Sequence, residues 1–252
     1  MANDVVMQNQ VAVITGASGG IGAAICERLA RAGTRIVIGY NANADQAHAL
    51  AARLAGSGHL VARAPVEDSH ALKQLADRVA QEYGKVDVLV NCAGVTRQVS
   101  HANLDELDDE LIDRIFRVNW RGAFATVRAF KALLAKDNGG TIINISSIAG
   151  TTGVGSNVAY CASKAALDSM TRSLARALAP QIRVLSIAPG WVEGEYAKKM
   201  NPEMIATQKQ LTPLKRIAQA EDVANAVYAA AALLTFSTGD IIHVDGGRPL
   251  GV

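Results

Sequence analysis

The sequence has few aromatic residues and little excess charge of either sign. Aromatic side chains make up 4% of its 252 residues, whereas 50% of the residues are hydrophobic and the formal net charge is +2. Lysine and arginine are scattered along the chain and form no basic stripe, so we expect no nucleic-acid partner. Abundant alanine and valine suit close packing of helices on a sheet better than an aromatic-rich binding surface.

Cysteine and long apolar runs are also scarce. Cys26, Cys92 and Cys161 are far apart and odd in number, which predicts buried free thiols. Neither they nor the five histidines have metal-ligand spacing, so no metal is expected. The longest apolar run, residues 226–236, is too short to span a bilayer. Residues 1–10 lack a signal-peptide pattern, so we expect a cytoplasmic protein without membrane association.

Strand and helix patterns alternate along the chain. Apolar or β-branched strand patterns cover residues 10–14, 35–39, 60–66, 86–90, 141–145, 182–187 and 240–245, and helical patterns lie between them, including a long one over residues 104–136. This alternation predicts an α/β fold, a doubly wound parallel sheet of about seven strands with helices on both faces. No linker is visible, so residues 1–252 are expected to form a single domain.

A glycine-rich turn joins the first strand to the first helix. Gly16, Gly20 and Gly22 lie in this turn, where a missing side chain lets the backbone approach a pyrophosphate at the start of a helix. Their spacing differs from the common G-x-G-x-x-G fingerprint, and a plain turn with spare glycines is the alternative. The strand before and the helix after the turn favour nucleotide binding.

The end of the second strand bears on the choice of cofactor. In dinucleotide-binding folds an acidic residue there binds the ribose 2′-hydroxyl and repels a 2′-phosphate. Tyr40 and Asn41 occupy this place and neither is acidic, which favours NADP(H). No basic side chain supports a phosphate at Gly19, so NAD(H) stays possible.

Three side chains with complementary chemistry follow the fifth strand. Ser147 comes just after the strand, and Tyr160 and Lys164 are four residues apart on one face of a predicted helix. A lysine ammonium one turn away favours the phenolate and lowers the tyrosine pKa toward neutrality. Ser147 adds a second donor for a substrate oxygen. Tyr-x-x-x-Lys alone is a weak signal, because two common residues at helical spacing often arise by chance.

Residues 191–215 interrupt the alternation with polar and charged residues. An insertion of this length after a strand is typical of a lid or substrate loop, and an ordinary surface loop is the alternative. Trp191 and Tyr196 are expected to shape a pocket. Lys198 and Lys199 could steer a negatively charged substrate.

Taken together, these motifs resemble the short-chain dehydrogenase/reductase family over the whole chain. The family's motifs occur in order as Thr15-Gly16-x-x-x-Gly20-x-Gly22, Asn91-x-Ala93-Gly94, Asn119, Ser147, Tyr160-x-x-x-Lys164 and Pro189-Gly190. The resemblance implies a single-domain Rossmann fold and an NAD(P)-dependent oxidoreductase. Within the family, the chain is most similar to 3-oxoacyl-acyl-carrier-protein reductases.

The resemblance also implies roles for individual residues. Tyr160 is the expected acid and base, Ser147 orients the carbonyl, Lys164 tunes Tyr160 and holds the ribose, and Asn119 holds a relay water. The expected cofactor-binding residues are Gly16, Ser18, Gly19, Gly20, Ile21, Gly22, Tyr40, Asn41, Val66, Asn91, Ala93, Gly94, Tyr160, Lys164, Pro189, Gly190 and Val192.

At three positions the chain departs from the family pattern. Pro65 replaces an acidic or amide residue beside the adenine, Gly194 replaces a threonine that binds the carboxamide, and Cys92 replaces an asparagine. None of these is among the expected catalytic residues.

Family members are usually tetramers, so we expect a homotetramer. Leu107, Leu111 and Ile115, with the alanine-rich face of the Tyr160 helix, are expected to form one subunit contact. Residues 226–234 with the C-terminal tail are expected to form the other.

Three functions remain open from the sequence. The first is NADPH-dependent reduction of a 3-oxoacyl thioester or similar ketone. The second is NAD-dependent oxidation of a small polyol, sugar or secondary alcohol. The third is a nucleotide-sensing protein without turnover, which would not need Tyr160 and Lys164 together.

Overall fold

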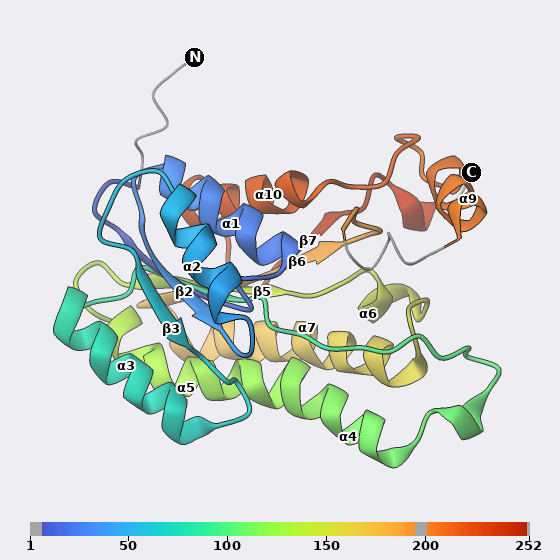
Figure 1. Ribbon diagram of the computed structural model, residues 1–252, viewed down its shortest axis with the longest axis horizontal. Coiled ribbons are helices and arrows are strands. Elements are labelled where there is room, and N and C mark those ends of the chain that lie inside the picture. Colours follow the sequence, from blue (N-terminus) through green and yellow to red (C-terminus); the bar gives the residue numbers. More distant parts are fainter. Residues whose placement is uncertain (1–6, 195–200, 251–252) are drawn as a thin grey trace.

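A computed structural model describes residues 7–194 and 201–250 of the chain. Its centre is a parallel sheet of seven strands, as predicted, and the strand order is β3-β2-β1-β4-β5-β6-β7 (Figure 1). The strands are β1 (Val11–Thr15), β2 (Arg35–Tyr40), β3 (Leu60–Arg63), β4 (Val88–Asn91), β5 (Gly140–Ile145), β6 (Ile182–Pro189) and β7 (Ile241–Val244). The order reverses between β1 and β4, which is where open sheets of this kind bind ligands.

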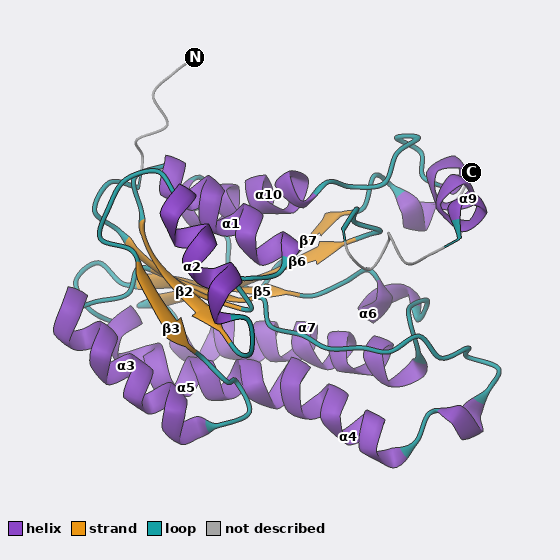
Figure 2. Ribbon diagram, in the orientation of Figure 1, coloured by secondary structure: helices purple, strands orange, loops and turns teal. Residues whose placement is uncertain are grey.

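Helices cover both faces of the sheet (Figures 1 and 2). One layer holds α1 (Gly20–Arg31), α2 (Ala44–Arg53) and α10 (Ala220–Ala232), and the other holds α3 (Ser69–Tyr83), α4 (Asp109–Phe116), α5 (Ala123–Leu134) and α7 (Val158–Leu178). The short α6 (Ala149–Thr152) and α9 (Pro202–Leu211) follow the carboxyl ends of β5 and β6. In the part of the chain that the structure describes, no helix is both long and apolar enough to cross a bilayer.

Aliphatic side chains on the two sheet faces form two separate cores. Ile14 and Ile143 belong to the core under α1 and α10, whereas Val13 and Ile142 belong to the core over α3, α5 and α7. Neighbouring strand residues point to opposite faces, so near-continuous apolar strands are needed when both faces are covered. Each fully buried aliphatic side chain contributes about 1.5–3 kcal/mol to the free energy of folding.

The predicted long helical region over residues 104–136 is continuously helical from Asp109 to Leu134, with a π-helical segment inside it. The structure has a 3-10 turn (Leu104–Glu106), then α4, a π-helical segment (Arg117–Gly122) and α5. Asp108 fixes the start of α4, because its carboxylate caps the helix by accepting a hydrogen bond from the Leu111 N–H at 2.7 Å. Hydrophobic periodicity does not reveal such a cap or a π segment.

Two other predicted elements also differ. The third strand ends at Arg63 rather than at residue 66, because Pro65 has no N–H to continue the ladder. The region 191–215 is not irregular throughout: it contains α9, whose first turn is capped by the side chain of Asn201. Tyr196, Lys198 and Lys199 lie outside the described residues.

Candidate active site

A cavity of about 880 Å³ opens at the carboxyl ends of the strands. Its volume is in the range of pockets that hold cofactors. Most of the residues predicted for the site line it: Gly16, Ser18, Gly19, Gly20, Ile21, Gly22, Asn41, Val66, Ala93, Gly94, Ser147, Tyr160, Lys164, Pro189, Gly190 and Val192. Tyr40, Asn91 and Asn119 are not among the lining residues.

The glycine-rich turn leaves space where a pyrophosphate would need it. A Cβ on Gly22 would lie 2.3 Å from the Gly16 carbonyl oxygen, and one on Gly16 would lie 2.8 Å from Ala93 Cα. These two glycines therefore allow the turn, α1 and the loop after β4 to pack closely. A Cβ on Gly20 would meet nothing within 4 Å. Since Gly20 begins α1 and faces the cavity, the turn fits a pyrophosphate at a helix N-terminus.

Two predicted cofactor-binding residues, Tyr40 and Asn91, contact other parts of the chain. Tyr40 packs against the core beneath α1. Asn91 is buried, and its side-chain N–H donates to Asn144 Oδ1 at 2.9 Å. Thr15, which sequence reasoning did not select, positions the loop after β4, because its Oγ1 accepts hydrogen bonds from the backbone N–H groups of Cys92 and Ala93, each at 3.2 Å.

The start of α7 fixes Tyr160 and Lys164 at the cavity wall. The Asn157 side chain caps the helix by accepting a hydrogen bond from the Tyr160 N–H at 2.7 Å. Lys164 Nζ lies 5.7 Å from the centroid of the Tyr160 ring and donates to the Ile145 carbonyl oxygen at 2.7 Å. Asn157 could have been recognised in the sequence as an N-cap residue before a helical pattern.

Burial of Lys164 makes its ammonium unusually acidic. The residue is 5% exposed, and desolvation lowers its pKa from 10.5 to about 8. A buried cation beside a phenol favours the phenolate form of that phenol. The arrangement therefore supports proton transfer by Tyr160 near neutral pH.

Ser147 and Asn119 differ in how they are placed. Ser147 lies at the cavity, and its Oγ accepts a hydrogen bond from the Ala149 N–H at 3.2 Å, which leaves its hydroxyl hydrogen for another acceptor. Asn119 is buried in the π-helical segment: its Oδ1 accepts from the Val95 N–H, and its Nδ2 donates to the Val95 carbonyl and to Ser163 Oγ. Asn119 thus holds the loop after β4, and its side chain can hold a water only through oxygen.

The three departures from the family pattern fall at different places. Cys92 and Gly194 line the cavity, and among the described residues none lies within 4 Å of where a Gly194 side chain would project. Pro65 does not line it, whereas its neighbours Ala64 and Val66 do.

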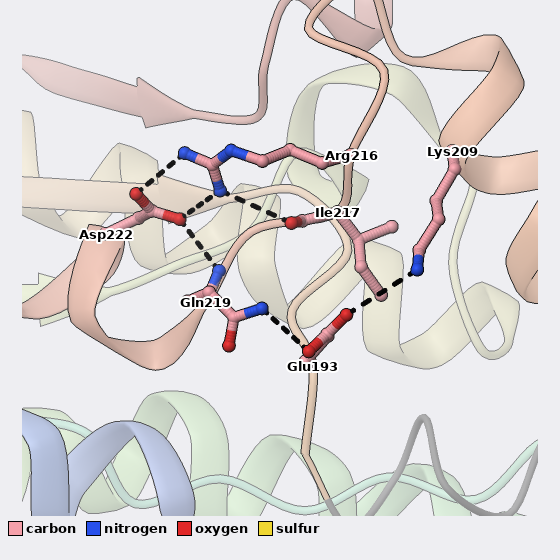
Figure 3. Close-up of polar contacts among 6 residues, drawn as sticks. All are labelled: Glu193, Lys209, Arg216, Ile217, Gln219 and Asp222. Atoms are coloured by element: carbon pink, nitrogen blue, oxygen red, sulfur yellow. Dashed lines mark hydrogen bonds and ion pairs between the residues drawn. The ribbon is translucent and has the colours of Figure 1, made fainter.

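The cavity wall after β6 is tied to α9 and α10 (Figure 3). Glu193 lines the cavity and accepts a hydrogen bond from Gln219 Nε2 at 2.7 Å, while Lys209 of α9 lies 3.8 Å from its other oxygen. Arg216 binds both oxygens of Asp222 in the first turn of α10. These contacts, which sequence reasoning missed, join the segment after β6 to the segment before α10.

Comparisons with known proteins agree with this geometry. A family model described as enoyl-(acyl carrier protein) reductase matches residues 16–248. The 3-oxoacyl-[acyl-carrier-protein] reductase of Aquifex aeolicus is 33% identical over 97% of this chain and 99% of its own. The cis-4-hydroxycyclohexanecarboxylate dehydrogenase of Sinomonas cyclohexanicum is 36% identical over 94% of this chain and 96% of its own.

A solved structure is similar over nearly the same length. The short-chain dehydrogenase/reductase of Brucella melitensis, described as a glucose/ribitol dehydrogenase, has 29% identity and a TM-score of 0.90, covering 96% of this chain and 97% of its own. The chain therefore belongs to the short-chain dehydrogenase/reductase family and is an oxidoreductase that acts on C=O or CH–OH groups.

Proposed function

We propose that this enzyme reduces the keto group of a 3-oxoacyl thioester, or of a similar ketone, with NADPH. The observation that carries the proposal is the pairing of Tyr160 with the buried ammonium of Lys164 at the wall of the cavity that also contains Ser147. The 3-oxoacyl-[acyl-carrier-protein] reductase among its relatives supports this substrate class.

The protein's own residues supply proton transfer and positioning. The Tyr160 hydroxyl donates its proton to the carbonyl oxygen as negative charge develops there, and the Lys164 ammonium stabilises the phenolate that remains. Ser147 donates a second hydrogen bond to the same oxygen. When bound, the nicotinamide group supplies the hydride for the carbonyl carbon. In the direction of oxidation, Tyr160 accepts the proton instead.

The adenosine end of the cavity supports NADPH over NADH. Asn41, Ala42 and Asn43 line it after β2, and none of them is a carboxylate that would repel a 2′-phosphate. Arg63 Nε donates to the Asn41 carbonyl oxygen at 3.4 Å, which places an exposed guanidinium beside this end. Glu67 is a carboxylate that also lines the cavity, but Arg117 lies 4.0 Å from it and offsets part of its negative charge.

A second function is NAD-dependent oxidation of a secondary alcohol. Gly19 offers no side chain to a 2′-phosphate, and one relative is a dehydrogenase of a hydroxylated ring acid.

Cofactor titration separates the two functions. For the first, NADPH binds more tightly than NADH by fluorescence, and Arg63→Ala weakens NADPH about tenfold while leaving NADH unchanged. Equal or tighter NADH binding in the wild-type protein would favour the second function.

Replacement of the tyrosine tests the catalytic assignment. We expect Tyr160→Phe to lower kcat for ketone reduction by about 10²–10⁴-fold with little change in NADPH affinity, because it removes only the proton donor. Tyr83→Phe is the matched control, since the Tyr83 hydroxyl on α3 donates to the Gly58 carbonyl away from the cavity. Near-normal turnover in Tyr160→Phe would contradict the assignment.

A further inference from the structure

Asp168 is a buried carboxylate with no part in the mechanism above. It lies on α7 one turn after Lys164 and two turns after Tyr160, so the three side chains share one face of the helix. Asp168 is 5% exposed, and its Oδ1 has no hydrogen-bond partner among the residues that the structure describes. Burying a carboxylate in this way is costly unless a positive charge compensates it.

The backbone packs tightly over this carboxylate. Gly150, in α6, sits directly on α7: a Cβ at this position would lie 2.8 Å from the Ala165 nitrogen and 3.2 Å from Asp168 Oδ2. The absence of a side chain therefore lets α6 cover Asp168. Shielding from solvent lowers the local dielectric constant, so the Asp168 carboxylate interacts more strongly with neighbouring charges.

Two cations and two hydroxyls face Asp168. Lys164 and Arg172 flank it on α7, while the hydroxyls of Ser146, just after β5, and of Ser186, within β6, face it. Burial raises the pKa of Asp168, and these four groups act in the opposite direction by stabilising the ionised form.

Asp168 is the source of negative charge for Lys164. Two groups favour the charged form of that lysine, Cys92 and Asp168. The pKa of Cys92 is itself raised to about 11 by burial, so its thiol is neutral between pH 7 and pH 9 and provides no negative charge there. The carboxylate is left as the group that offsets the buried ammonium.

We propose that Asp168 is a positioning residue for Lys164: its buried carboxylate keeps the lysine protonated, and therefore able to assist Tyr160, over the working pH range. The consequence for turnover rests on the proposed function, in which Lys164 stabilises the phenolate of Tyr160. The electrostatic effect on Lys164 does not depend on turnover and can be measured by itself.

Competitive labelling measures the protonation of Lys164 directly. Trace dinitrofluorobenzene is reacted with the folded protein across pH 6 to 11, and the Lys164 peptide is quantified by mass spectrometry. We expect a midpoint near pH 8 in the wild-type protein, as its lowered pKa requires. In Asp168→Asn we expect a midpoint about one pH unit lower, because the neutral amide no longer favours the ammonium. Asp113→Asn, an equal change at an exposed position on α4, should match the wild type.

Turnover provides the second readout. The pH at which kcat/KM for ketone reduction falls on the alkaline side should move down by the same amount in Asp168→Asn, a shift that a merely structural role would not produce. Should Asp168→Asn fail to fold, Ser186→Ala replaces it. Loss of the Ser186 hydroxyl makes the ionised form of Asp168 less stable, so the Lys164 labelling midpoint should move in the same direction by a smaller amount.

Coinciding Lys164 midpoints in the variant and the wild type would overturn the proposal. Because labelling needs no turnover, it decides the role of Asp168 even if the wild-type protein reduces no ketone. A failure to reduce ketones would count against the proposed function and not against the role of Asp168.

Discussion

At the scale of single residues, burial changes the acidity of the groups in the site, and residue type decides the direction of the change. Lys164 and Cys92 both lie at the cavity wall, and desolvation acts on them in opposite directions because their charged forms have opposite signs. The lysine becomes a stronger acid and the thiol a weaker one. Sequence reasoning expected all three cysteines to be buried free thiols; Cys26 and Cys161 are buried, whereas Cys92 is half-buried at the cavity.

Cys92 should therefore react slowly with alkylating reagents. Its pKa is raised from 9.0 to about 11, and only the thiolate is nucleophilic, so the pH at which iodoacetamide labelling becomes fast should lie about two units higher in the folded protein than in guanidinium. Peptide mass spectrometry across pH 7 to 11 gives both curves. Bound NADPH should slow the labelling further, since Cys92 lines the cavity. Coincident folded and unfolded curves would contradict the assigned environment.

At the scale of elements, the turn between β1 and α1 combines two different demands on glycine. Gly22 is needed because α1 packs against the backbone of the turn, whereas Gly20 faces open space in the cavity. Gly22 thus serves the fold, and we expect Gly20 to serve the ligand. The sequence shows both as spare glycines and does not distinguish them.

Alanine substitutions separate the two demands. We expect Gly22→Ala to lower the free energy of unfolding by about 3 kcal/mol, because its Cβ would lie 2.3 Å from the Gly16 carbonyl oxygen. Gly20→Ala, its matched control, should leave the melting temperature unchanged or slightly higher, because alanine favours helix. The same change should weaken NADPH binding at least about tenfold. Thermal melts and fluorescence titrations test both; a stable Gly22→Ala, or unimpaired NADPH binding by Gly20→Ala, would contradict this division.

Local periodicity predicted the elements better than their interruptions. The parallel sheet followed from apolar strands alternating with helical patterns, and Ser147, Tyr160 and Lys164 followed from their places at a strand end and on a helix face. Local periodicity did not predict the π-helical segment around Asn119. The Asn119 side chain is held by Val95 and Ser163, and such contacts between residues distant in sequence leave no local pattern. The packing of Tyr40 against the core did not follow either, since it is a tertiary contact.

At the scale of the whole molecule, the exposed apolar surface bears on assembly. Ile115, which we expected in a subunit contact, is fully buried within its own chain and cannot form one. Exposed apolar side chains occur instead at Leu104 and Trp120 near α4, and at Leu233 and Phe236 after α10. Exposed apolar side chains near both α4 and the end of α10 are compatible with the two interfaces that the expected homotetramer would need.

Mass measurement tests this assembly. We expect the wild-type protein to have about four times the 26.4 kDa mass of one chain by light scattering after size exclusion. Phe236 is 105% exposed, so Phe236→Asp should leave the fold intact while burying a charge in the interface near α10, which leaves a particle of about two chains. Val154→Asp, at an exposed apolar position on the cavity rim, is the control and should keep the wild-type mass. A wild-type mass of one chain would rule out the homotetramer, and an unchanged mass in Phe236→Asp would place the second interface away from the end of α10.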